Sequence, residues 1–110
     1  MILQMEKLKR YLQSICFLPD SDWEILSAKL HRREMKKKHL LLKPGEVEHY
    51  LSFLETGIVR YWIPGKDREI TFEIAFENSF ATAYDSFLTR LPSNYFAETI
   101  AYFLQLSMLF

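Results

Sequence analysis

The 110-residue sequence has one cysteine, three glycines and no excess of charge of either sign. A single cysteine, Cys16, excludes an internal disulfide and a four-thiolate zinc site. Glycine occurs only at positions 45, 57 and 65, which excludes a glycine-rich phosphate loop. The longest apolar stretch, 100–110, is too short for a bilayer, which takes about 20 residues. We therefore expect one soluble, cytoplasmic domain that does not contact a membrane.

Hydrophobic residues make up 49% of the chain and charged residues 25%, proportions typical of a globular protein. The charges are unevenly distributed. Residues 1–43 hold ten basic and five acidic side chains, whereas residues 44–110 hold four basic and nine acidic ones. This polarity predicts a dipolar field but does not identify a partner.

Apolar residues at helical spacing predict a first helix close to the N-terminus. Pro19 ends this helix, and we expect Phe17 and Leu18 to enter the core just before it. The apolar stripe consists of Met5, Leu8, Leu12 and Ile15.

A second helix is predicted after Pro19. Asp20 or Ser21 is the expected N-cap, and Ser21 followed by Glu24 has the spacing of a capping box. We expect the helix to end near His31 or Arg32. Its expected apolar side consists of Trp23, Leu26 and Leu30.

The remaining pattern is typical of strands. Two alternating runs, 59–63 and 70–74, flank a Pro-Gly turn and predict a β-hairpin. Three further segments are predicted to be extended, namely 47–54, 95–101 and 102–110. The coarse architecture is two helices packed on an antiparallel sandwich or roll. Because 100–110 is so apolar, we expect a downstream segment or a second chain to cover it.

Several turn motifs occur in a characteristic order: Lys43-Pro44-Gly45-Glu46, then Leu54-Glu55-Thr56-Gly57-Ile58-Val59-Arg60-Tyr61, the 59–74 hairpin, and Glu77-Asn78-Ser79-Phe80. In this order the sequence resembles the cyclic-nucleotide-binding domain of the Crp/Fnr (catabolite activator) family of transcription regulators. The resemblance implies a mainly β fold with N-terminal helices, a double-stranded β-helix or jelly-roll-like β-roll.

The resemblance places the phosphate-binding cassette of the family at 81–95. There the family has a Gly-Glu pair that opens a short helix and binds the ribose, and an Arg that pairs with the phosphate. Ala81 and Thr82 stand in place of Gly-Glu, and Asn94 and Tyr95 stand near the Arg position. Arg90 precedes the Leu91-Pro92 turn and is expected to be out of register. The expected degenerate pocket consists of Ala81, Thr82, Ala83, Asn94 and Tyr95.

Without both charged anchors, a buried phosphate is left unpaired, which costs several kcal/mol. We therefore expect the domain to keep the fold without binding cyclic AMP at useful strength. A different pocket ligand remains open, as does a pocket filled by aromatic side chains. The aromatic candidates are Phe80, Tyr84, Phe87, Tyr95 and Phe96.

The resemblance also implies domain limits and partners. Residues 1–110 form one domain, with a helical segment 1–32 and a β-roll 33–110. Family members continue into a dimerisation helix and a helix-turn-helix domain, which this sequence does not contain. The chain is therefore expected to be a fragment or a stand-alone sensor. We expect a homodimer, with DNA contact only through the missing C-terminal domain.

Enzyme chemistry finds little support in the residues. His49 and Glu55 match only part of a cupin metal motif, which needs a His-x-His pair. No Gly-x-Ser-x-Gly elbow is present, and Cys16 lies far in sequence from every histidine. We expect no catalytic residue, metal or cofactor. A cupin-like metalloenzyme and a plain interaction module that dimerises through 100–110 are the alternatives.

The basic run 31–39 has two readings. One is a phosphate-contacting patch for nucleic acid. The other, which we favour, is a solvated strand or loop with Met35 and Leu40 turned inward.

Overall fold

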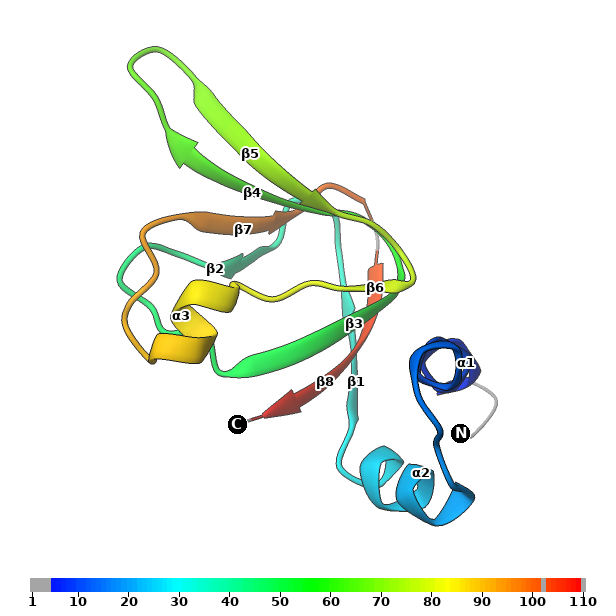
Figure 1. Cartoon of the computed structure of the whole chain (residues 1–110). Helices are drawn as coiled ribbons and strands as arrows, with labels where there is room; N and C mark the ends of the chain where they lie inside the picture. Colours follow the sequence, from blue (N-terminus) through cyan, green and yellow to red (C-terminus); the bar gives the residue numbers. More distant parts are fainter. Residues whose placement is uncertain (1–4, 102, 110) are drawn as a thin grey trace.

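The computed structural model describes residues 5–101 and 103–109. Two short helices precede a β-roll that carries one further helix (Figure 1). The elements in chain order are α1 (Glu6–Ile15), α2 (Asp20–Ser27), β1 (His31–Met35), β2 (Leu40–Leu42), β3 (Tyr50–Thr56), β4 (Val59–Pro64), β5 (Glu69–Ala75), β6 (Ser79–Phe80), α3 (Tyr84–Thr89), β7 (Phe96–Thr99) and β8 (Phe103–Leu109).

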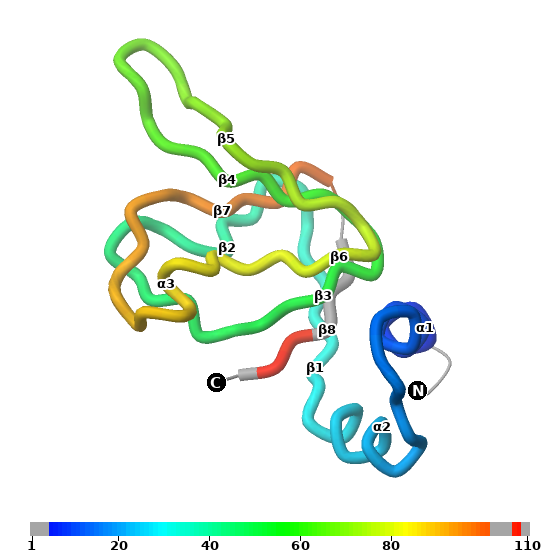
Figure 2. Tube along the Cα trace, in the orientation of Figure 1, coloured from blue at the N-terminus to red at the C-terminus, as the bar shows by residue number. Residues whose placement is uncertain are grey.

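The strands form two four-stranded antiparallel sheets, with strand orders β1-β8-β3-β6 and β2-β7-β4-β5. The predicted mainly β fold is thus confirmed. The β4–β5 hairpin projects beyond the rest of the trace (Figure 2). No helix in the described part of the chain is long and apolar enough to cross a membrane.

The roll encloses the main core. Leu54 and Val59 are fully buried at its centre, where β3 turns into β4. Gly57 makes this turn with φ of 100°, a conformation that residues with a Cβ rarely adopt. The other buried members of this core are Leu42, Tyr61, Ala75, Ala81, Ala83 and Ala97.

A second core lies between the helices and the first sheet. Leu8 and Trp23 are buried there against Phe53 of β3. The rings of Tyr11, Phe53 and Phe80 meet edge-on or tilted, with centroids 5.5 to 5.7 Å apart. Helix α1 is thus fixed to the roll by aromatic packing.

Two expected core residues near the end of α1 are exposed instead. Ile15 is 64% exposed and Phe17 is 89% exposed. Cys16 has an extended backbone, with φ of −157°, so the chain leaves the helix direction there. Because side chains alternate along an extended chain, Leu18 packs into the second core while Phe17 faces solvent.

The expected capping box of α2 is wrong. The helix begins at Asp20, and its N-cap is Pro19, with no side-chain cap hydrogen bond. The backbone N–H groups of Asp22 and Trp23 donate to the Pro19 carbonyl, so Ser21 already lies inside the first turn. The helix is also shorter than expected, because α2 ends at Ser27 and β1 begins at His31.

The predicted hairpin is confirmed, with one irregularity. β4 and β5 pair from Val59 opposite Ala75 to Pro64 opposite Glu69. Between Tyr61–Glu73 and Trp62–Thr71 the register shifts by one residue, which leaves Phe72 without a partner. Phe72 is therefore the extra residue of a β-bulge.

The apolar C-terminal segment needs no outside cover for its backbone. Strand β8 lies inside the first sheet and pairs with β1 on one side and β3 on the other. The buried hydroxyls of Ser52 and Ser107 are 2.9 Å apart across this pairing. The sequence offered no sign of this central position. The expectation that a downstream segment or a second chain covers the apolar side chains of 100–110 stays a prediction. Residues 102 and 110 of that prediction lie outside the described residues.

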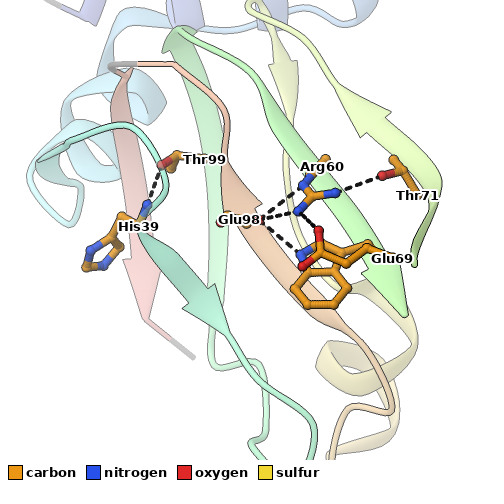
Figure 3. Close-up of polar contacts among 7 residues, drawn as sticks. His39, Arg60, Glu69, Thr71, Glu98 and Thr99 are labelled. Atoms are coloured by element: carbon orange, nitrogen blue, oxygen red, sulfur yellow. Dashed lines mark hydrogen bonds and ion pairs between the residues drawn. The ribbon is translucent and has the colours of Figure 1, made fainter. Parts of the chain in front are cut away.

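The basic run contributes β1 and the loop before β2. Met35 packs against the main core as expected, but Leu40 is 40% exposed. A register shift between Leu40 and Leu42 breaks the alternation that would have turned Leu40 inward. The loop is held by Thr99, whose hydroxyl donates to the Lys36 carbonyl at 2.6 Å and accepts from the His39 N–H at 2.9 Å (Figure 3).

Candidate ligand pocket beside helix α3

Residues 81–95, here called the cassette segment, connect β6 to β7 and contain α3. Its first residues are buried against β3: the Ala81 N–H donates to the Ser52 carbonyl at 2.8 Å. The Thr82 hydroxyl oxygen accepts from the Ser52 N–H at 3.2 Å. These bonds fix the start of the segment on the sheet.

A carboxylate of the protein lies at the next residue. Glu48 accepts the Ala83 N–H at 3.4 Å and the Tyr50 N–H at 3.1 Å. Burial raises the pKa of Glu48, although these two N–H groups and the nearby Arg33 act in the opposite direction. The backbone donor just before α3 is therefore already in use.

Two serines hold the segment against the 45–48 loop. The buried Ser86 hydroxyl accepts from the Glu48 N–H at 3.0 Å and donates to the Leu91 carbonyl at 2.6 Å. The Ser93 N–H donates to the Glu46 carbonyl at 2.7 Å, and its carbonyl accepts from Gly45 at 2.9 Å. The cassette segment is thus anchored at both ends.

A pocket of about 260 Å³ opens between the cassette segment and the hairpin. β4 supplies Tyr61, and β5 supplies both Phe72 and Glu73. Neighbours in a regular strand face opposite sides, so the bulge at Phe72 explains why two consecutive residues reach one pocket. The lining consists of Tyr61, Phe72, Glu73, Thr82, Tyr84, Asp85 and Tyr95.

The Tyr95 ring organises the aromatic side of the pocket. It meets Tyr61 edge-on at 6.0 Å between centroids and Phe72 edge-on at 5.1 Å. Its hydroxyl donates a hydrogen bond to Asp85 of α3. Burial, followed by this bond, raises the pKa of Tyr95.

The Tyr61 side chain differs from its neighbours. The residue is 3% exposed, yet its hydroxyl makes no hydrogen bond among the described residues. Burial raises the pKa of Tyr61, and the charge of Glu48 adds to this effect. The hydroxyl is not among the enclosed polar atoms of the described chain that lack a partner, so it is accessible from the pocket that Tyr61 lines.

No protein-family model matches the sequence, and no curated protein sequence matches it significantly. Solved structures do resemble the fold. The regulatory domain of protein kinase A from Toxoplasma gondii, solved with cAMP, has a TM-score of 0.79 at 13% identity over 96% of this chain. The regulatory subunit of a cAMP-independent protein kinase A from Trypanosoma cruzi, bound to guanosine, has a TM-score of 0.75 at 14% identity over 98% of this chain.

The catabolite activator protein of Thermus thermophilus has a TM-score of 0.68 at 15% identity over 84% of this chain. The chain has the cyclic-nucleotide-binding fold. The β-roll expected from the Crp/Fnr resemblance is thereby confirmed. The chain spans 41%, 40% and 42% of the lengths of these three proteins.

The charges in the pocket lining are all of one sign. Its charged lining residues are the carboxylates Glu73 and Asp85, and no Lys, Arg or His is among the described lining residues. Arg90, the arginine within the cassette segment, lies over the Phe87 ring at 5.5 Å and is not part of the lining. The electrostatics thus disfavour an anion.

Of the site residues predicted from the sequence, only some lie in the pocket lining. Thr82 and Tyr95 line the pocket, Ala81 and Ala83 are buried beside it, and Asn94 is exposed outside it. Sequence reasoning missed Tyr61, Phe72, Glu73 and Asp85. The hairpin prediction placed the first three on adjacent strands, but the bulge that brings Phe72 and Glu73 together had no sequence signal.

The five aromatic candidates do not form one cluster. Tyr84 and Tyr95 line the pocket, whereas Phe80 belongs to the second core. Phe96 stacks on Trp62 at 4.1 Å between centroids, and Phe87 contacts Arg90. The group neither stacks on one ligand nor fills the pocket.

The partial cupin motif does not converge. Glu55 is 3% exposed and pairs with Arg32 at 3.3 Å, while His49 is exposed. Among the described residues, no group of three or more His, Cys, Asp or Glu side chains is placed to hold a metal ion. Burial raises the pKa of Glu55, and one of its carboxylate oxygens lacks a hydrogen bond within the described chain.

Proposed function

We propose that this chain is the effector-sensing domain of a Crp/Fnr-like transcription regulator, with a cassette that does not bind cyclic AMP and no catalytic activity. One observation carries the proposal. The pocket beside α3 holds Glu73 and Asp85 in its lining and no basic side chain among the described residues. A phosphate placed there would face two carboxylates without a counter-charge.

The backbone supports the same conclusion. In the related family, N–H groups at the start of the short helix meet the phosphate. Here the carboxylate of Glu48 already accepts the Ala83 N–H at 3.4 Å. A cyclic nucleotide would have to displace a carboxylate and remain without an arginine, which typically costs several kcal/mol.

One of the similar structures supports a sensing role without a cyclic phosphate. The regulatory subunit of a cAMP-independent protein kinase A from Trypanosoma cruzi is bound to guanosine, whereas the Toxoplasma gondii domain was solved with cAMP. We propose that this chain acts as a homodimer in its full context. DNA contact would come from a C-terminal domain outside this sequence, as in the family that it resembles.

Calorimetric titration of the chain with cyclic AMP tests the proposal. We expect no heat of binding at micromolar nucleotide. Saturation with a micromolar dissociation constant would contradict the proposal, because the lining would then tolerate a phosphate.

A stand-alone interaction module is the second candidate. It is favoured by exposed apolar side chains on β5 and just after it, at 41% to 58% exposure: Ile70, Phe72, Ile74 and Phe76. The bulge places Phe72 and Ile74 on opposite sides of the strand, so both sides of the hairpin offer apolar surface for a protein contact. Sedimentation would detect a dimer that Ile74→Asp dissociates, whereas a monomer at high concentration would contradict this candidate.

A further inference from the structure

We propose that the pocket beside α3 binds a small organic ammonium ion, whose charge lies between Glu73 and Asp85 and whose body packs on the tyrosine and phenylalanine rings. This inference rests on the proposed function, because it names the chemical class of effector for the same pocket. A cation in place of a cyclic phosphate inverts the charge preference expected of the cyclic-nucleotide-binding fold.

The charge of the pocket lining favours a cation. The Glu73 side chain makes no ion pair or hydrogen bond within the described chain. Asp85 accepts one hydrogen bond, from the Tyr95 hydroxyl. Both carboxylates line one pocket without a basic residue in the described lining. An ammonium group is the counter-charge that this arrangement lacks.

The aromatic rings of the pocket lining also favour a cation. Four rings contribute to the pocket: Tyr61, Phe72, Tyr84 and Tyr95. A cation near the face of an aromatic ring gains about 0.5–1 kcal/mol at an exposed site and about 2 kcal/mol when desolvated. Rings together with carboxylates are therefore selective for an organic cation.

The Tyr61 hydroxyl also favours an ammonium group. The Tyr61 side chain is buried and lines the pocket, and no hydrogen bond among the described residues uses its hydroxyl. A hydroxyl oxygen accepts from an ammonium N–H. A bound amine would thus give this hydroxyl a hydrogen-bond partner that the described residues do not supply.

Size and access restrict the ligand further. The volume of about 260 Å³ lies just below the range of pockets for drug-sized ligands, about 300–1,000 Å³. Phe72 is 50% exposed and Tyr84 is 46% exposed, so the pocket opens to solvent between β5 and α3. A single-ring amine fits these limits.

A bare metal ion fits less well. Within the described chain, no three acidic, histidine or cysteine side chains converge on one point. Calcium takes six to eight oxygen ligands, and magnesium requires near-octahedral coordination. Two carboxylates beside aromatic rings match an organic ammonium better.

A charge series of matched probes tests the proposal by calorimetry on the whole chain. The probes are 2-phenylethylamine, 2-phenylethanol and phenylacetate, which share a ring and differ in charge. We expect the amine to bind about tenfold more tightly than the alcohol, a factor that corresponds to about 1.4 kcal/mol and lies between the values for an exposed and a desolvated cation–π contact. Equal binding of amine and alcohol, tighter phenylacetate, or no amine binding would overturn the proposal.

Variants locate the binding site. We expect Glu73→Gln to weaken amine binding about tenfold and to leave alcohol binding unchanged, since the ring contacts remain. Glu24→Gln on α2 removes an exposed carboxylate outside the pocket and should change neither. Asp85→Asn serves as a second variant if Glu73→Gln does not fold. An unchanged amine affinity in the folded pocket variant would contradict the proposal.

The two proposals fail in different ways. Micromolar binding of cyclic AMP would overturn the proposed function through its own titration. An absent amine response together with absent cyclic AMP binding would overturn only the ligand class named here, and would leave an effector domain of another specificity.

Discussion

On one face of strand β4 the charged side chains are paired with one another, and on the other face they are not. Arg60 and Tyr61 are neighbours, so their side chains leave the strand on opposite sides. On the Arg60 side, the guanidinium bonds to Glu98 at 2.7 and 3.1 Å, to Glu69, and to the Thr71 hydroxyl at 3.2 Å (Figure 3). On the Tyr61 side, two carboxylates line a pocket without a basic residue in the described lining.

The paired face explains a motif residue. Arg60 belongs to the Crp/Fnr-like turn motif, and here it connects β4 with β5 and β7 rather than binding a ligand. The Trp62 indole N–H also donates to Glu98 at 3.1 Å. Hydrogen bonding to Glu69 raises the pKa of Arg60. The charges on the Arg60 face hold strands together, whereas the carboxylates on the pocket face are available to a ligand.

The largest expected effect comes from breaking the paired face. Arg60→Met leaves Glu69 and Glu98 without their counter-charge, and Glu98 has a side chain only 14% exposed. We expect the free energy of unfolding to fall by about 2–3 kcal/mol, somewhat less than for a fully buried pair. Urea denaturation measures it. Arg10→Met, at an exposed position of α1, should cost less than about 0.5 kcal/mol. Equal losses in the two variants would contradict this account.

A smaller loss is expected at the end of β7, an inner strand of the same sheet. Thr99 has no exposed surface, and its hydroxyl satisfies the Lys36 carbonyl and the His39 N–H. Thr99→Val keeps the shape and removes both bonds, so the free energy of unfolding should fall by about 1–3 kcal/mol. The exposed Thr71→Val is the matched control, expected to lose less than Thr99→Val. We expect the melting temperature of Thr99→Val to lie below that of Thr71→Val, and the reverse order would contradict this prediction.

The contact between Glu48 and the cassette segment should make the stability of the fold depend on pH. Burial raises the pKa of Glu48 above the ordinary value of 4.5. Its protonated form therefore favours folding below pH 4.5, and this contribution is lost as pH rises through the raised folded-state pKa. Glu48→Gln cannot ionise, so its stability relative to the wild type should increase between acidic and neutral pH. If the stability of Glu48→Gln relative to the wild type falls as pH rises, the raised pKa of Glu48 is contradicted.

The smallest expected effect on stability belongs to Glu73. Its side chain has no partner within the described chain, so Glu73→Gln should change the free energy of unfolding by less than about 0.5 kcal/mol. A thermal melt of the variant measures it. A loss as large as that of Arg60→Met would mean that Glu73 is a structural charge, and the contrast between the two faces would disappear.

Local patterns predicted the hairpin well, because alternation and a Pro-Gly turn act over few residues. They could not predict the exposure of Phe17, which depends on the extended backbone at Cys16. Nor could they predict that β8 lies between β1 and β3, a pairing between strands far apart in sequence.

The pocket was predictable only in part. The family resemblance located the cassette segment, and two of its named residues, Thr82 and Tyr95, line the pocket. Phe72 and Glu73 enter through a bulge whose position follows from strand register. Asp85 was not singled out from the sequence. The sequence shows that Gly-Glu and Arg do not stand at the positions where the resemblance expects them, whereas the two carboxylates of the pocket lining required the fold.

The most direct test of the inverted charge preference compares two ligands residue by residue. Amide chemical shifts of the isotope-labelled chain are followed during parallel titrations with 2-phenylethylamine and with cyclic AMP. The account predicts saturable shifts at Tyr61, Glu73 and Asp85 with the amine, and none at Ala83 with the nucleotide. Saturable shifts at Ala83 with cyclic AMP, and a silent pocket with the amine, would contradict it.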